Sequence, residues 1–271
     1  MKKEILRMAI SYLLSFVSSL CLTVAILLLA VTVVLSRPFT HAVIEHCNYE
    51  ELAHREIVES LETLAIPGGL PDDFFAAGLD KELLKSDIER GVDTAYSGVP
   101  FEHSEFSSVL RERIEQYARD TETDPENETV AAAITQLMAY FDSVYRASVS
   151  TGAMRFLASG FNLLFPWGIV GIFVLAALTA LFMAVVKKMN EEYSGHYFSG
   201  FLGGAALMLA ALPAAVLLSG RVAKLGISSP PTFALMSSVI YAFLWGLITA
   251  AAVLIAATII MAIIKKVSSK R

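Results

Sequence analysis

Four long apolar runs without a single Asp, Glu, Lys or Arg constrain this chain more than any other feature. They cover residues 8–35, 156–186, 197–219 and 233–264. Each is longer than the roughly 20 residues that an α-helix needs to cross the hydrocarbon core of a bilayer. A helix also satisfies its own backbone hydrogen bonds, as a membrane span must. The sequence therefore predicts an all-α integral membrane protein with four transmembrane helices.

The first run is interpreted as a retained signal anchor, residues 8–36. A cleaved signal peptide has a shorter apolar region followed by a small-residue cleavage site, whereas this run continues to Val-Val-Leu-Ser-Arg-Pro. The remaining spans are predicted at 156–186, 197–219 and 233–264, and the segment between the first two spans is long enough for one compact domain.

Basic residues flank the four runs unevenly. Nine Lys and Arg residues stand in residues 1–7, 187–196 and 265–271, whereas the 220–232 loop contains two. Lys and Arg near the ends of spans mark the cytoplasmic side. The termini and the 187–196 loop are therefore predicted to be cytoplasmic, and residues 37–155 and the 220–232 loop extracytoplasmic, in a multi-pass plasma-membrane protein.

The predicted outer segment, residues 37–155, is strongly acidic. It holds ten basic and 23 acidic residues, a formal charge of −13. Nucleic acids and anionic membrane surfaces attract basic patches, so this segment argues against both as partners and is compatible with a cationic one. Cys21 in the first span and Cys47 outside it are too far apart to form a disulfide. The composition as a whole is typical of a bacterial plasma-membrane protein.

Caps and breakers divide residues 37–155 into helices. Asn48 and Glu51 resemble a capping box at a helix start, Pro71 suits the first turn of a short helix, and Asp80 suits an N-cap. Apolar side chains recur at three- and four-residue spacing in the stretches near residues 52–64, 83–92, 106–117 and 134–144. The sequence predicts an extracytoplasmic helical-bundle domain inserted between the first and second spans.

Three of the five histidines gather just after the first span, in His41-Ala-Val-Ile-Glu-His-Cys-Asn-Tyr-Glu-Glu-Leu-Ala-His-Arg-Glu56. In an unbroken helix His46, Glu50 and His54 would share one face, where neighbours four apart can share a metal. A straight face cannot close a tetrahedral shell, and Asn48 favours a helix start inside the stretch. His41, His46 and His54 are also the candidates for a catalytic base near the headgroups. The alternative is the solvated start of an amphipathic helix.

A second polar stretch, from Asp120 to Glu128, has oxygen ligands at alternate positions, like the start of a calcium loop. An EF-hand loop requires Gly at its sixth position and Glu at its twelfth, where this chain has Pro125 and Ala131. The sequence therefore favours a solvated loop, with weak divalent-cation binding as the alternative. No cofactor is expected.

The spans themselves carry no Asp, Glu, Lys, Arg or His in their apolar centres. Pumps and ion-coupled transporters usually need such groups, so these classes are disfavoured. The third span contains Gly200 and Gly204 followed by Ala210, small residues that let helix backbones approach closely. Packing among the four spans and homo-oligomerisation are the two interpretations of this pattern.

The sequence thus favours a non-enzymatic binding, sensing or accessory protein that acts through its acidic outer domain. The expected partners are the bilayer itself and either another protein or further copies of the chain. One alternative is a membrane-embedded enzyme acting on lipid or lipoprotein with the juxtamembrane histidines. The order of one anchor, an outer segment and three spans is similar in outline to bacterial lipoprotein intramolecular acyltransferases, but the His-Met-x-Asp-Val-Lys type motif of that family is absent. The second alternative is an oligomeric pore.

Overall fold

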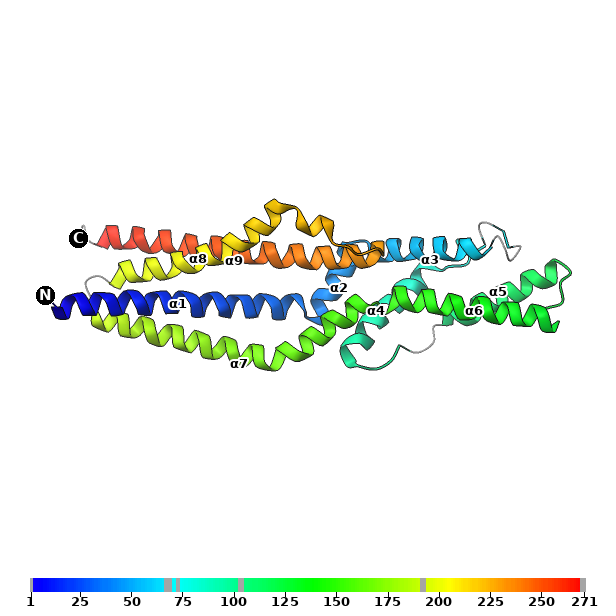
Figure 1. Ribbon diagram of the computed structural model, residues 1–271, viewed down its shortest axis with the longest axis horizontal. Helices are drawn as coiled ribbons and strands as arrows, with labels where there is room; N and C mark the ends of the chain where they lie inside the picture. The colour runs from blue at the N-terminus through cyan, green and yellow to red at the C-terminus, as the bar shows by residue number, and fades with distance from the viewer. Residues whose placement is uncertain (1, 66–69, 72–73, 102–104, 191–193, 269–271) are drawn as a thin grey trace. The chain divides into compact units, whose positions relative to one another are not determined.

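A computed structural model describes residues 2–65, 70–71, 74–101, 105–190 and 194–268. These residues form helices joined by short connections, with no strand among them (Figure 1). The helices are α1 (Lys2–Val34), α2 (Arg37–His46), α3 (Tyr49–Ala65), α4 (Lys81–Ser97), α5 (Glu105–Asp120), α6 (Glu128–Val149), α7 (Gly152–Met189), α8 (Ser194–Ser219), the 3-10 turn η1 (Arg221–Lys224) and α9 (Pro230–Ser268).

Four of these helices are long and apolar enough to cross a membrane, which confirms the predicted number of spans. The qualifying segments are Lys3–Val34, Gly152–Met189, Ser194–Ser219 and Pro230–Ile263. Each helix begins before its uncharged run, because the end of a helix depends on caps and breakers and not on where hydropathy changes. Pro166 and Pro213 lie inside α7 and α8 without ending them.

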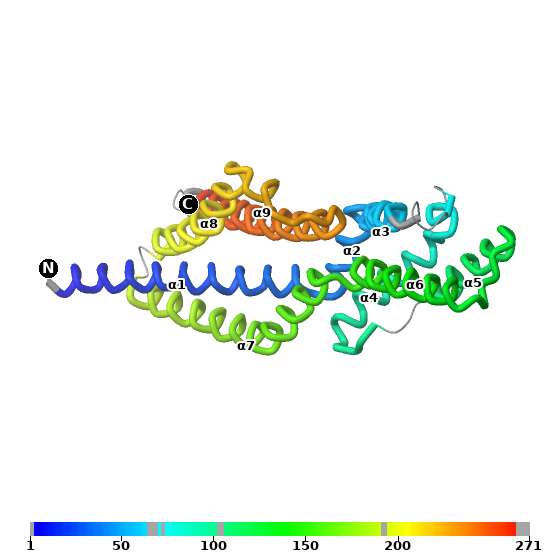
Figure 2. The backbone as a smooth tube through the Cα atoms, turned by 45° about the vertical axis from the view of Figure 1, so that its right-hand side comes forward, coloured from blue at the N-terminus to red at the C-terminus, as the bar shows by residue number. Residues whose placement is uncertain are grey.

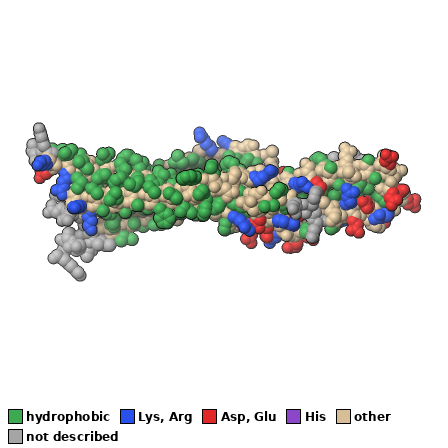
Figure 3. All heavy atoms as spheres, turned by 90° about the horizontal axis from the view of Figure 1, so that it is seen from below, with side chains coloured by type: hydrophobic (Ala, Val, Ile, Leu, Met, Phe, Trp, Pro, Cys, Tyr) green, Lys and Arg blue, Asp and Glu red, His purple; other side chains and the backbone are tan. Residues whose placement is uncertain are grey.

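The chain divides into two compact units. The apolar unit comprises Met1–Leu35, Phe161–Leu225 and Val239–Arg271, and the polar unit comprises Ser36–Gly160 and Gly226–Ser238. On the face drawn in Figure 3, hydrophobic side chains cover the apolar unit, whereas acidic and basic side chains mark the polar unit. The polar unit includes the segment just before α9, where the Ser229 hydroxyl donates a hydrogen bond to Glu56 Oε2 of α3 at 2.9 Å.

In the apolar unit, α1 and α8 pack closely through small side chains. The Ser19 hydroxyl donates to the Phe201 carbonyl oxygen at 2.6 Å, and a Cβ on Gly204 would lie 3.0 Å from Ser19 Oγ. Gly200 has open space around its Cβ position. Ala210 borders a buried cluster formed by Ala206, Leu209, Leu247 and Ala251. Of the two glycines in the predicted motif, Gly204 and not Gly200 therefore lies at the contact between α8 and α1.

Helix α7 runs alongside α1 in both backbone views (Figures 1 and 2). Two glycines make that approach: a Cβ on Gly168 would lie 3.1 Å from Thr32 Oγ1, and one on Gly171 would lie 3.3 Å from Leu28 Cδ1. The sequence interpretation did not single out this pair, because two glycines three apart in an apolar run are common and carry no partner information.

The polar unit is organised around α3, α4, α5 and α6, with a fully buried aromatic core. The rings of Phe106, Phe141 and Tyr145 lie 5.2 to 5.5 Å apart. The carboxylate of Asp87 is completely buried and accepts hydrogen bonds from Tyr145 at 2.7 Å and from Arg90. A buried charge requires such partners, so this network fixes how α4 meets α6.

Helices α4 and α6 approach each other closely at Gly91. A Cβ added there would lie only 2.2 Å from the Val149 carbonyl oxygen. Since that neighbour is backbone, no side-chain rotation can make room, and the position requires glycine.

The chain between α2 and α3 differs from the predicted capping box. Asn48 has φ of +52°, which is the left-handed conformation that ends a helix and not the extended one of an N-cap. The predicted helix start is present, because α3 begins at Tyr49 and the Leu52 N–H donates to the Asn48 carbonyl oxygen at 3.2 Å, but the backbone of Asn48 is left-handed and not extended. The stretch after Pro71 also differs: Phe74 to Gly78 form hydrogen-bonded turns in place of the predicted short helix. Asp80 does cap α4, accepting from the Glu82 N–H at 2.9 Å.

Candidate binding cleft

A cleft of about 360 Å³ opens where α2, α3 and α4 meet, at the helix break. Its lining residues are His41, Ile44, Glu45, Asn48, Tyr49, Glu50, Glu51, Lys85, Ile88 and Glu89. Ile44 and Ile88 are buried and form its apolar part. Asn48, at the helix break, is itself a lining residue and stands between the α2 and α3 residues that line the cleft.

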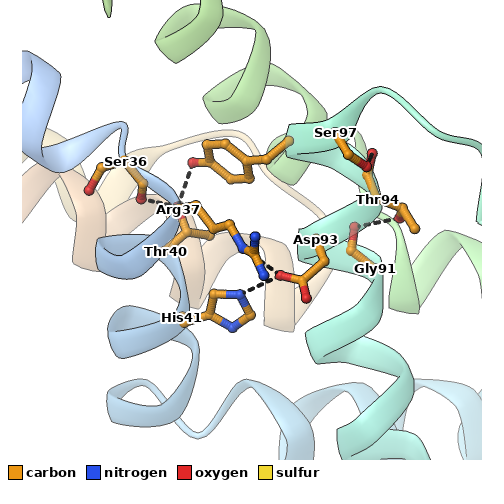
Figure 4. A network of polar contacts seen from close by, with 9 residues as sticks. Ser36, Arg37, Thr40, His41, Gly91, Asp93, Thr94 and Ser97 are labelled. Atoms are coloured by element: carbon orange, nitrogen blue, oxygen red, sulfur yellow. Dashed lines mark hydrogen bonds and ion pairs between the residues drawn. The ribbon is translucent and has the colours of Figure 1, made fainter.

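His41 is held at one side of the cleft by an acidic residue of α4. Its Nε2 lies 2.8 Å from Asp93 Oδ1, and Arg37 Nε lies 2.7 Å from the same oxygen. Figure 4 shows the Arg37 and His41 side chains of α2 both directed at Asp93. The carboxylate is therefore shared by a permanent cation and an imidazole. The contact fixes the orientation of the imidazole ring, as a carboxylate does for a functional histidine.

A second contact between α2 and α4 lies beside this cluster. The hydroxyl groups of Thr40 and Tyr96 are 2.8 Å apart, and Thr40 is completely buried. Burial raises the pKa of Tyr96, which keeps the phenol protonated at neutral pH. The α2–α4 side of the cleft is thus held by two independent polar contacts.

Tyr49 lines the cleft and joins α3 to the end of α6. Its ring is fully buried, and its hydroxyl donates to the Ser148 carbonyl oxygen at 2.8 Å. Desolvation by burial raises the pKa of Tyr49 far above its usual value. Tyr49 follows the left-handed Asn48 directly, and its side chain is buried in the core from the first turn of α3.

Four carboxylates line the cleft: Glu45, Glu50, Glu51 and Glu89. Glu51 accepts from Lys81 Nζ at 2.9 Å, and this bond lowers the pKa of Glu51. Lys85 is the basic residue among the described lining residues, apart from His41. The cleft therefore carries an excess of negative charge inside a unit that is itself acidic, an arrangement that attracts cations.

The structure separates the residues of the predicted metal face. His46 is exposed and ends α2, whereas Glu50 and His54 lie on α3 after the break. Glu50 and His41 line the cleft, and neither His46 nor His54 does. Within the described part of the chain, no group of three or more His, Cys, Asp or Glu side chains converges as a metal site would require.

His46 and Cys47 are adjacent in the sequence, which raises the question of a histidine-activated thiol. Burial raises the pKa of the Cys47 thiol, which disfavours the reactive thiolate. The thiol donates weakly to the Ile44 carbonyl oxygen.

Carboxylates of the predicted cation loop, from Asp120 to Glu128, make local bonds. Asp120 accepts from the Gln116 amide at 2.9 Å, and Asp124 accepts from the Glu126 N–H at 3.0 Å. The first contact lies at the end of α5, and the second lies in the turn that follows it. They hold the two side chains in separate local structures of the loop.

Sequence reasoning missed Glu89 as a lining residue of the cleft, and it missed Asp93 and Arg37 as the partners that meet beside His41. Asp93 and Glu89 stand about fifty residues from His41 and are two of 23 acidic residues in the segment. The only available signal was indirect: Asp93 lies next to the apolar face of its helix, one residue after the buried Val92.

Comparison with protein-family models, with curated proteins and with solved structures found no match to this chain.

Proposed function

We propose that this protein is a non-enzymatic multi-pass membrane component whose acidic polar unit lies outside the cytoplasm and binds a cationic partner in the α2–α3–α4 cleft. The observation that carries the proposal is the cleft itself, with four glutamates around an apolar floor. A basic peptide segment of another protein fits that chemistry, because its ammonium or guanidinium groups pair with the carboxylates and its aliphatic stems pack on Ile44 and Ile88.

The orientation of the chain is supported by contacts within the apolar unit. Asn190 at the end of α7 donates to Ser11 near the start of α1. The rings of Tyr12 and Tyr197, in α1 and α8, lie 5.0 Å apart. The start of α1 and the end of α7, which both carry basic residues, thus meet at one end of this unit together with the start of α8, which fits a shared cytoplasmic side.

A reporter active only in the cytosol tests the orientation. Inserted near Gly98, an exposed turn after α4, it should be silent, whereas the same reporter after Arg271 should be active. Activity at Gly98 would contradict the proposed location of the polar unit.

Binding is tested with the full chain in mild detergent and a fluorescently labelled hexalysine peptide as the probe. The fluorescence anisotropy should rise on binding at low salt and fall as salt screens the charges. The Glu45→Gln/Glu89→Gln variant should bind about tenfold more weakly, since two of the four carboxylates are neutralised.

The matched control for this experiment is Glu122→Gln/Glu126→Gln, which makes the same charge change at exposed residues outside the cleft. It should retain most of the affinity. Equal losses in both variants would show that the probe responds to net charge alone and would remove the cleft from the proposal.

One observation favours an enzyme as the second candidate. Asp93 orients the imidazole of His41 as a general base is oriented. Alanine substitution of His41, His46 and His54 together, with folding checked by circular dichroism, should leave most of the hexalysine binding, which rests on the four glutamates, and should abolish the activity of such an enzyme.

A further inference from the structure

A second pocket of the polar unit has the opposite electrostatic character. It measures about 580 Å³ and lies among the end of α4, the end of α6 and the first turn of α7. Its lining residues are Thr94, Ala95, Gly98, Val99, Pro100, Phe101, Ser143, Arg146, Ala147, Ser150 and Arg155. Two guanidinium groups and three hydroxyl groups face it, and none of these described lining residues is acidic.

The described carboxylates next to the lining residues in sequence are engaged elsewhere. Asp93 pairs with Arg37 and His41. The carboxylate of Asp142 accepts from the Ser107 hydroxyl at 2.6 Å. A pocket lined by arginines within a segment of formal charge −13 is therefore a local reversal of the charge that dominates the unit.

The position of Arg155 indicates which anions can reach this pocket. Arg155 precedes by one residue the uncharged run 156–186, and both belong to α7. A basic residue at the end of a membrane span lies at the level of the lipid headgroups. Its guanidinium donates to the Ser150 carbonyl oxygen at 3.3 Å, so it is held on the α6 side where Arg146 also lies.

The loop at the mouth of the pocket is apolar. Val99 is 56% exposed, and Pro100 and Phe101 follow it. The guanidinium of Arg90 stands 5.8 Å from the Phe101 ring centroid. An exposed apolar loop beside two arginines matches a ligand that carries a phosphate on an aliphatic body.

We propose that this pocket binds the phosphate group of an anionic phospholipid of the surrounding leaflet. Arg146 and Arg155 hold the phosphate oxygens, since guanidinium groups match phosphate geometry. Ser143, Ser150 and Thr94 contact the polar headgroup, and Val99 lies against the acyl region. Binding there fixes the polar unit at the membrane surface through a site separate from the acidic cleft.

The test uses the full chain reconstituted in nanodiscs of phosphatidylcholine with one-fifth phosphatidylglycerol, followed by native mass spectrometry of the retained lipid. The ratio of phosphatidylglycerol to phosphatidylcholine retained by the parent should be about tenfold higher than the ratio in the bilayer. The Arg146→Gln/Arg155→Gln variant should lose that enrichment. The control Arg111→Gln/Arg119→Gln, which removes the same charge from exposed positions of α5, should keep it.

Two outcomes would overturn the proposal. One is equal lipid retention by the parent and the Arg146→Gln/Arg155→Gln variant when both have the parental circular dichroism spectrum. The other is binding of inorganic phosphate or glycerol phosphate in detergent without lipid enrichment, which would assign the pocket to a soluble anion. If the double variant is misfolded, Arg155→Lys replaces it, and a loss of enrichment of several-fold is expected because lysine cannot bind phosphate in a bidentate manner.

Discussion

The two units accommodate buried polar side chains in different ways. In the apolar unit, the buried polar groups of α1 are hydroxyls, and most bond within their own helix: Ser11 donates to the Arg7 carbonyl oxygen, Ser18 to that of Leu14 and Thr23 to that of Ser19. In the polar unit, buried Tyr49 and Asp87 bond to partners 99 and 58 residues away.

This difference teaches what holds each unit in register. A membrane helix satisfies its backbone hydrogen bonds within itself. Its hydroxyl side chains can therefore bond within the same helix, and its packing against other helices depends on small residues. In the polar unit, the helices are fixed against each other by polar bonds that leave a costly unpaired group when broken. Cross-helix bonds should therefore matter more in the polar unit than in the apolar unit, which the following substitutions test.

The largest effect is expected at Asp87. Replacing it by alanine leaves the Tyr145 hydroxyl without its acceptor and Arg90 without its carboxylate, and should lower the free energy of unfolding by about 3 kcal/mol. Urea titration of the full chain in mild detergent, followed by circular dichroism, measures it. Asp87→Asn keeps an oxygen acceptor and should lose less. A loss below about 1 kcal/mol for the alanine variant would contradict the role given to this network.

Gly91→Ala should have the next largest effect. The added methyl group would overlap the Val149 carbonyl oxygen, so α4 and α6 must separate, at a cost of about 2 kcal/mol. Gly152→Ala is the matched control, because nothing lies within 4 Å of its Cβ position. The same urea titration applies to both, and equal stability of the two variants would show that the α4–α6 approach is not tight.

Alkaline pH should destabilise the polar unit through Tyr49. Burial raises the folded-state pKa of Tyr49 above the unfolded value near 10. The stability that depends on the neutral phenol is thus fully present below pH 10 and is lost as pH rises towards the folded-state pKa, by about 1.4 kcal/mol per pH unit. Urea titrations between pH 9 and 11.5 measure this slope. It should become shallower in Tyr49→Phe, and an unchanged slope would assign the alkaline loss to other groups.

The smallest effect is expected in the apolar unit. Ser19→Ala removes the bond to the Phe201 carbonyl oxygen between α1 and α8 and should cost about 0.6 kcal/mol. Ser18→Ala removes a bond within α1 and should change stability by less than about 0.3 kcal/mol. Thermal unfolding in mild detergent compares the two. If Ser19→Ala cost as much as Asp87→Ala, the contrast between the units would fail.

The sequence predicted much of the fold but little of the cleft. The four spans, the break at Asn48 and the Asp80 cap follow from composition and local hydrogen bonding, which act over a few residues. The cleft brings His41 and Glu45 of α2 together with Glu89 of α4, and His41 contacts Asp93 of α4, so it joins helices far apart in the chain. The glycine contacts show the same limit: Gly200 and Gly204 look alike in sequence, yet one is open and the other meets Ser19.

The amino-acid sequence by itself determined that this chain has four helices able to cross a membrane and an acidic helical segment between the first two. Length and hydropathy are sufficient for this prediction, because each helix must by itself be long and apolar enough to cross the bilayer. The tertiary structure decided which charges meet: carboxylates line the cleft of α2, α3 and α4, and arginines line the pocket at the start of α7. The net charge of a segment can be counted from the sequence, but the charge of a site depends on which residues folding brings together.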